Sequence, residues 1–359
     1  MATVSSSLLG RNLYVPAVQV TVEGAPLPAT VAHSIREVIV DERIDAPGSF
    51  SLQVHDPGMR LMDPNNGIFA EGREASIRLG YLPQLETLIE GEITALEPNF
   101  PQDGAPALTV RGFDFLHRLT RGAVTRVFSG LTLAQIFQKI ASEMGLPEKA
   151  DSVADLDKAV EYLAQSNVSN LDFLQERAGR LGLALWVENR TLRLGRRTAT
   201  PGREPITLAW GKTLGSFQPR LTTAGQVEEV VVRAWDPVRG REIVGRARRN
   251  DLLTAALSSS GRQQAARGSG GRSQTAAIDR PVFSQAEADA MAAAVLSDIT
   301  DSLITGSGSS IGRTEIRAGA DINLTGVGRF SGTYQVVETT HTFGAGGYQT
   351  TFEVRKRIV

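Results

Sequence analysis

The sequence lacks cysteine, contains four histidines, and has an aromatic content of 6% in 359 residues. Without cysteine there are no disulfides, thiolate metal sites or cysteine nucleophiles, which suits folding in a reducing cytoplasm. No segment approaches the roughly 20 apolar residues that a membrane-spanning helix requires. The polar residues 1–10 contain no basic segment, so we expect neither a signal peptide nor stable membrane association.

An excess of either charge is also absent, because 38 basic residues stand against 39 acidic ones. This balance favours neither a nucleic-acid-binding protein nor one attracted to a membrane surface. Arginines gather at residues 246–249, 262–272 and 355–357, but no aromatic residue is interleaved with them. Because stacking platforms are missing, solvated faces and loop ends are favoured over nucleic-acid contact.

The first third of the chain alternates between apolar and polar residues, which is typical of half-buried strands. Val18, Val20 and Val22 show this alternation, and residues 50–54 repeat it. Turn-forming residues cluster at 24–28, 46–49, 64–67 and 98–106. At 41% apolar residues the chain is long enough for two or three domains, and we assign residues 1–122 to a first antiparallel β-domain.

The next segment changes to helical spacing. A capping pattern begins at Thr132, apolar residues follow at helical intervals, and Gly145 ends the helix. Ser169 begins a second helix in the same way, and Gly182 ends it. A hairpin follows around Glu188 and Asn189, so we expect a small α+β domain with two helices and a hairpin over residues 123–203.

Strand character returns from residue 206, and we assign residues 204–359 to a second β-domain. A run rich in glycine, serine, arginine and glutamine, at about 256–278, predicts a flexible loop. Ser284 and Glu287 then predict the start of an inserted helix over about 284–305. We interpret the glycines at 306–308 as the C-terminal stop of that helix.

We find no sequence pattern that requires catalysis, a cofactor or a metal. His33, His55, His117 and His341 have no metal-site spacing, so each is interpreted as a surface or hydrogen-bonded structural histidine. Residues 268–273 are glycine-rich but do not form a phosphate-binding loop, and no G-x-S-x-G motif is present. Glu90 and Glu92 are the nearest local candidates for the carboxylate pair that glycoside cleavage requires. We interpret both as strand residues whose side chains face solvent.

One segment resembles a known family. Residues 169–182, with the sequence SNLDFLQERAGRLG, are followed by the strand residues 185–187 and 192–195. This succession resembles the helix-then-hairpin signature of the phage late control protein D family, which includes the hub portion of type VI secretion VgrG proteins. Residues 88–119, 217–236 and 332–350 resemble further segments of the same family, in the same order.

The resemblance implies a mainly β fold with α+β insertions: two tube-like antiparallel β-barrels and a small helical and hairpin domain. It implies a non-enzymatic structural hub in the baseplate of a phage-type contractile tail, assembled in the bacterial cytoplasm. Such a hub forms a homotrimer that adapts the sixfold tail tube to the threefold central spike and lines the delivery channel. Its partners would be the tube ring, a trimeric spike protein and other baseplate proteins, with DNA only as transient cargo.

Several details depend on this resemblance. No spike-like extension follows Val359, so the spike is expected to be a separate polypeptide. His341 and Tyr348 would hold the terminal hairpin, and Trp186 and Trp235 would be packing anchors. The alternatives are a tail-associated peptidoglycan hydrolase and a receptor-binding module with an exposed aromatic platform. The parent particle, whether a phage, a gene-transfer particle or another injection system, stays open.

Overall fold

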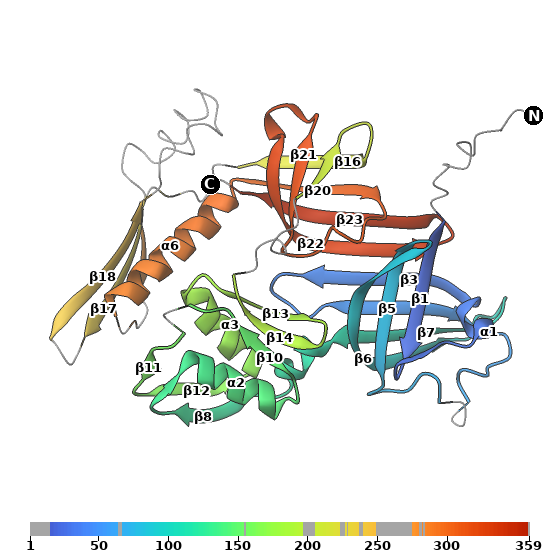
Figure 1. The fold of residues 1–359 in the computed structure, drawn as a ribbon, viewed down its shortest axis with the longest axis horizontal. Helices are drawn as coiled ribbons and strands as arrows, with labels where there is room; N and C mark the ends of the chain where they lie inside the picture. The colour runs from blue at the N-terminus through green and yellow to red at the C-terminus, as the bar shows by residue number, and fades with distance from the viewer. Residues whose placement is uncertain are drawn as a thin grey trace, which may run out of the picture.

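The computed structural model describes residues 15–63, 67–153, 156–196, 205–222, 227, 229–236, 240–248, 275–279, 282 and 284–357 (Figure 1). It is mainly β, as the sequence predicts. Within the described part, no helix is long and apolar enough to cross a membrane. The predictions for residues 1–10, the glycine-rich segment 268–273 and the arginine cluster 262–272 lie outside the described residues.

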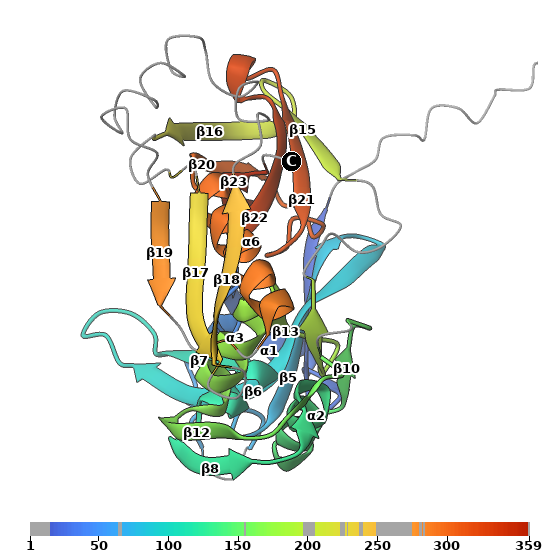
Figure 2. The same ribbon diagram turned by 90° about the vertical axis from the view of Figure 1, so that its left-hand side faces the viewer.

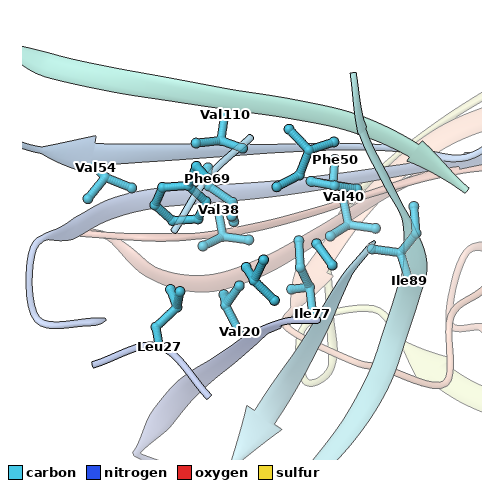
Figure 3. Close-up of a cluster of buried hydrophobic side chains, with 14 of the residues drawn as sticks. Val20, Leu27, Val38, Val40, Phe50, Val54, Phe69, Ile77, Ile89 and Val110 are labelled. Atoms are coloured by element: carbon cyan, nitrogen blue, oxygen red, sulfur yellow. The ribbon is translucent and has the colours of Figure 1, made fainter. Parts of the chain in front are cut away.

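The N-terminal part is a set of antiparallel strands. They are β1 (Pro16–Val22), β2 (Ala25–Pro26), β3 (Ile35–Arg43), β4 (Ser49–His55), β5 (Glu74–Tyr81), β6 (Gln84–Asn99) and β7 (Ala107–Asp114), with the short helix α1 (Ala29–Ala32) between β2 and β3. The alternation predicted for residues 18–22 and 50–54 is confirmed, since Val20 and Phe50 point into one apolar core (Figure 3), to which Val22 also belongs. The strands therefore fold around the apolar face that the period of two marks out.

The central part is built from helices and short strands. They are the 3-10 helix η1 (Phe115–Thr120), β8 (Val124–Phe128), β9 (Leu131–Thr132), α2 (Leu133–Glu143), β10 (Glu148–Ala150), β11 (Ala159–Val160), β12 (Leu163–Val168), α3 (Asn170–Arg180), β13 (Ala184–Glu188) and β14 (Thr191–Gly195). Both predicted helix starts are confirmed: Thr132 forms a capping box with Gln135, and the Ser169 hydroxyl accepts a hydrogen bond from the amide of Asp172. The predicted hairpin is confirmed as β13 and β14. A separate apolar core holds this part together.

The C-terminal part contributes strands to two sheets. One uses β15 (Ile206–Ala209), β16 (Leu214–Leu221), β20 (Ile304–Ile311), β21 (Asp321–Thr325), β22 (Gly332–Gly344) and β23 (Gly347–Lys356), with the 3-10 helix η2 (Gly328–Phe330) before β22. The other pairs β17 (Glu229–Asp236) with β18 (Arg241–Arg248) and β19 (Thr275–Asp279), and helix α6 (Gln285–Asp301) packs on one face of it. Figure 1 shows this second sheet and α6 standing to one side of the molecule.

The N-terminal and C-terminal strands join into one 13-stranded sheet. Its main path runs β16-β20-β23-β22-β3-β4-β7-β6-β5-β1-β2, so the junction is the pairing of β22 with β3. That pairing is antiparallel, from Glu338 opposite Arg43 to Phe343 opposite Val38. Among the described strands this path is open, and no pairing closes either half into a barrel.

Three sequence predictions around α6 need correction. The start at Ser284 is confirmed by its hydrogen bond from the amide of Glu287, but the helix ends at Asp301. Gly306 and Gly308 lie inside β20, so they do not stop a helix. Glycine is needed at these positions because a Cβ atom would collide with the ring of Phe217 at 306 and with that of Phe352 at 308. The predicted loop also extends too far, since residues 275–279 form β19 beside β17. The rest of that loop lies outside the described residues.

A close backbone approach within the first core gives a test of this packing. We expect Gly91→Ala in β6 to lower the free energy of unfolding by about 1–3 kcal/mol or more, because its Cβ would lie 1.9 Å from the carbonyl oxygen of Phe113. The matched control is Gly179→Ala in α3, where a Cβ meets nothing within 4 Å and should stabilise the helix by about 0.5–1 kcal/mol. Urea unfolding of both variants measures the difference. Equal effects of the two substitutions would contradict the described register of β6 and β7.

Candidate functional site

The junction between the two halves of the large sheet is the first candidate site. Arg317, from the loop before β21, bridges it: Nε donates to Glu42 Oε2 in β3 at 2.6 Å, and Nη1 donates to the carbonyl oxygen of Thr87 at 3.2 Å. Its Nη2 also donates to Glu42 Oε1 and to the carbonyl oxygen of Leu88. One guanidinium from the C-terminal half therefore holds two strands of the N-terminal half. Planar, charge-assisted contacts of this kind fix geometry as well as charge.

His341 in β22 lies at the same junction and is fully buried. Its Nε2 lies 3.0 Å from the carbonyl oxygen of Ile316, which can only accept, so Nε2 carries the proton. Nδ1 is then the acceptor for the hydroxyl of Tyr348 at 2.8 Å and for that of Thr350 at 3.1 Å. Burial lowers the pKa of His341 to about 4, so the ring is neutral near pH 7. The predicted hydrogen-bonded structural histidine is thus confirmed.

Tyr348 connects the terminal hairpin to the core of the N-terminal half. Although it belongs to β23, its ring is part of the first apolar core and lies 5.9 Å from the ring of Tyr81. Burial raises the pKa of its hydroxyl, so it stays protonated and can donate to His341. The terminal hairpin is therefore held by a hydrogen-bonded pair of side chains, His341 and Tyr348, as the sequence predicts.

A second polar cluster joins the N-terminal strands to the central part. Glu92 in β6 is 7% exposed, and its Oε1 accepts a hydrogen bond from Arg118 Nε at 3.0 Å. Its Oε2 accepts from Arg121 Nη2 at 3.0 Å. Arg118 also donates to the carbonyl oxygen of Met144 at the end of α2, at 3.1 Å. Burial acts to raise the pKa of Glu92, but the Arg118 guanidinium outweighs it and the pKa is lowered.

His117 belongs to the same cluster. Its Nδ1 lies 2.7 Å from the carbonyl oxygen of Asp114, and its Nε2 lies 2.9 Å from Arg121 Nη2 and 3.1 Å from Glu92 Oε2. Burial lowers the pKa of His117, so the neutral ring donates from Nδ1 and accepts from Arg121 at Nε2. Arg121 Nη2 donates to both His117 Nε2 and Glu92 Oε2 and so bridges these two acceptors, and the structural interpretation of this histidine is confirmed.

This geometry corrects the prediction for the carboxylate pair. Glu90 is half-buried, but Glu92 is not solvated: it lies in the arginine cluster with a lowered pKa, which is the opposite of what a general acid needs. The sequence could not reveal this because Arg118 is 26 residues away. In the described part of the chain, no group of three or more His, Asp or Glu residues is placed to hold a metal ion.

The remaining predicted positions are dispersed. His33 is exposed at the end of α1, and His55 in β4 lies 3.4 Å from a guanidinium nitrogen of Arg36. Trp186 is half-buried in β13. The prediction that Trp235 is a packing anchor is wrong, since this residue is 62% exposed at the end of β17.

One row of polar side chains crosses the junction. In strand order from β16 to β4 it consists of Ser216, Ser309, Thr351, Thr340, Asp41 and Ser49. All of them are exposed or half-buried. The hydroxyl oxygens of Ser216 and Ser309 lie 2.7 Å apart, and the Thr340 hydroxyl donates to Asp41 Oδ1 at 2.5 Å. The row therefore forms a hydrogen-bonded polar face over both halves of the sheet.

This polar face is hollowed over its C-terminal half. The hollow has a volume of about 630 Å³, and side chains of β16, β20, β22 and β23 line it. Next to the first row runs a second one, made of Gln218, Ser307, Glu353, Glu338 and Arg43. Arg43 lies 3.5 Å from the Glu338 carboxylate, so the two charge signs are mixed on this face.

The family described as the Alg8 N-terminal domain matches residues 13–344, and the chain belongs to this family. That description names a domain and no reaction. No curated protein matches the chain.

Solved structures define the fold class. The 43 kDa tail protein of prophage MuSo2 from Shewanella oneidensis is 13% identical, with a TM-score of 0.68 over 94% of this chain and 98% of that one. A tail protein from Neisseria meningitidis MC58 is 14% identical, with a TM-score of 0.69 over 96% and 97%. The E. coli c3393 protein, a type VI secretion component similar to T4 tail proteins gp27 and gp5, is 14% identical, with a TM-score of 0.57 over 93% and 76%. The chain thus has the fold of phage tail proteins and of a type VI secretion component, which confirms the resemblance.

The burial of His341 predicts an acid-sensitive junction. Its folded pKa of about 4 lies below the ordinary value of 6.5, so its stabilising contribution is lost as the pH falls from about 6.5 towards 4. Between pH 7.5 and 5 we expect wild type to lose about 2 kcal/mol more unfolding free energy than His341→Gln, which keeps a donor and an acceptor but does not titrate. Urea unfolding at both pH values measures this. All other titrating groups are common to both proteins, so identical pH dependences would contradict the assignment.

The Glu92 cluster predicts a loss of stability on neutralising one carboxylate. We expect Glu92→Gln to lower the unfolding free energy by about 1.5–3 kcal/mol, because it weakens the charge-assisted hydrogen bonds between Glu92 and Arg118, both of which are largely shielded from water. Glu97→Gln, in the same strand, is the matched control: its ion pair with Arg111 is about half exposed and should contribute about 1 kcal/mol or less. Thermal or urea unfolding compares them. A larger loss in the control would show that the cluster does not stabilise the junction.

Proposed function

We propose that this chain is a structural, non-enzymatic hub in the baseplate of a phage-type contractile tail. The observation that carries the proposal is the polar face that continues from β16 to β4 across the β22 and β3 junction. As a homotrimer, the hub adapts a sixfold tail tube to a threefold spike. Three chains with two β-parts each supply six similar units, and the similar fold of phage tail proteins supports this role.

In this proposal the polar face lines the delivery channel. Its hydroxyl and amide side chains hold water without offering apolar area to a passing molecule. Its three carboxylates, Asp41, Glu338 and Glu353, outnumber the cation Arg43, so the face would not bind a polyanion such as DNA. The hollow over β16 and β23 gives the face the concave shape of a channel wall. DNA is then transient cargo and not a bound ligand.

Assembly also explains the open sheet. The path ends at β16 on one side and at β2 on the other, and such edges are ready to pair with another chain. Closure of both β-parts into tube-like barrels is proposed to involve neighbouring chains, since a symmetric ring hides these edges. The division into domains at 1–122, 123–203 and 204–359 is kept as part of this proposal. The four apolar cores, one of which belongs to α6 and its sheet, support it.

The partners are the tube ring, a separate trimeric spike protein and other baseplate proteins, and the location is the tail baseplate of the particle. The titles of similar solved structures support this placement, because they describe tail proteins and a type VI secretion component. A peptidoglycan hydrolase is not favoured, since the Glu92 carboxylate is bound to Arg118 and Arg121.

The test is the mass of the purified chain by light scattering, alone and with the separate spike protein. We expect a trimer, or trimerisation when the spike protein is added. A chain that stays monomeric with both the tube and the spike protein would overturn the proposal.

The same samples test the channel wall. Since the chain has no cysteine, Ser309→Cys provides a single thiol on the polar face and Ser142→Cys a control thiol at the exposed end of α2. In the trimer, we expect the thiol at 309 to react with a small maleimide but to be shielded from a maleimide on a long polymer. The thiol at 142 should react with both reagents. Equal reaction of the two thiols with the long reagent in the trimer would place the polar face outside the channel.

A further inference from the structure

The sheet formed by β17, β18 and β19 has one face covered by α6 and a second face, here called the open face. On the open face Val231 is buried, but the arginines and Trp235 are exposed. Val230, Val232 and Ile243 pack against α6 and form the covered face. The alternate residues Arg233, Trp235 and Arg246 therefore belong to the opposite face. Figure 2 looks onto this face, and no described element lies in front of the three strands.

This open face has the composition of a protein contact surface. Trp235 is 62% exposed, while tryptophan and arginine are the residues most enriched at the energetic centres of interfaces. Arg233 lies 3.5 Å from Glu242, and Arg248 lies 3.2 Å from Glu229, so these two pairs are nearly neutral. Arg246 is the further exposed cation on the face. Asp279 of β19 lies opposite Arg233, so the described strands place no excess positive charge on this face. This balance favours a protein partner over a nucleic acid, because the latter needs several phosphate contacts.

The chain itself carries a complementary element. The tip of the β6–β7 hairpin, residues 97–106, contains Glu97, Phe100 and Asp103 but no basic residue. Phe100 is 60% exposed and Asp103 is also exposed. The hairpin projects from the body of the molecule (Figure 2). Glu97 is paired with Arg111. The tip therefore offers the exposed Phe100 and the carboxylate of Asp103, which match the exposed Trp235 and Arg246 on the open face.

We propose that the β6–β7 tip of one chain docks on the open face of β17 and β18 in the neighbouring chain. Phe100 would pack against Trp235, and Asp103 would pair with Arg246. The contact is heterologous, since two different surfaces of the same chain meet, and repetition of such a contact with the right rotation closes a ring. The inference rests on the proposed trimer and names the surfaces that hold it together.

The natural absence of cysteine allows a direct test in the full-length chain. Gln102→Cys places a thiol at the tip, and Glu242→Cys places one opposite Trp235, so the four proposed contact residues are kept. The two single variants are mixed and treated with a short bis-maleimide. We expect a cross-linked pair that contains one chain of each kind. A mixture of Ser142→Cys with Glu242→Cys is the matched control and should give no such pair.

The outcomes separate this contact from the trimer itself. A chain that is trimeric by light scattering but gives no more cross-linking than the control mixture overturns the contact and leaves the hub proposal standing. In a chain that carries both Gln102→Cys and Glu242→Cys, cross-linked products that grow beyond three members support the contact and overturn the closed trimer. Cross-linking that stops at three members supports both.

Charge reversal gives an independent readout. Asp103→Arg and Arg246→Glu should each weaken self-association roughly tenfold or more, as measured by sedimentation, because each places like charges together. The double variant restores an opposite pair and should recover most of the loss. Single variants that associate like wild type, or a double variant as weak as the single ones, would overturn the pairing of Asp103 with Arg246.

Discussion

The pairing of β22 with β3 is the interaction on which the rest of the structure depends. It turns two groups of strands, separated by the whole central part of the sequence, into one sheet. Because the register is fixed there, Arg317 meets Glu42 and Tyr348 enters the core of the other half. A slip of one residue would send every side chain of β22 to the wrong face. The hydrogen bond from the Thr340 hydroxyl to Asp41 crosses the junction and favours one register, while the hydrogen bonds of His341 order the C-terminal side of it.

The joints between parts of the molecule are polar, whereas the parts themselves have apolar cores. Arg317 holds the two halves of the sheet, and Glu92 with Arg118 holds the central part. Apolar packing tolerates many arrangements of similar volume, but a buried carboxylate needs its donors at fixed positions. Polar joints therefore set the relative orientation of the parts. In the proposed trimer, the match between neighbouring chains would depend on that orientation more than on any single core.

The sequence predicted those features whose cause is local. The caps at Thr132 and Ser169 were predictable because each hydroxyl binds an amide three residues further on. The alternation in β1 and β4 revealed the core face for the same reason. The Glu92 cluster and the exposure of Trp235 were not predictable. Both depend on which element lies opposite. Val232 and Ala234 face α6, so Trp235, which alternates with them, lies on the other face of the strand and is exposed, although an apolar side chain suggests burial.

The same dependence explains why the sequence did not place Trp235 on one face with the arginines. In the sequence no aromatic residue stands among the arginines at 246–249, but β17 pairs with β18 and brings Trp235 onto the face that carries Arg246. The large sheet shows the opposite arrangement, with hydroxyls and mostly acidic charges along a continuous face. In the proposed hub, a wall that DNA passes needs hydrated side chains without excess positive charge, whereas a surface that holds a neighbour needs exposed aromatics and a cation for an acidic partner. The two faces differ in the way that these two tasks require.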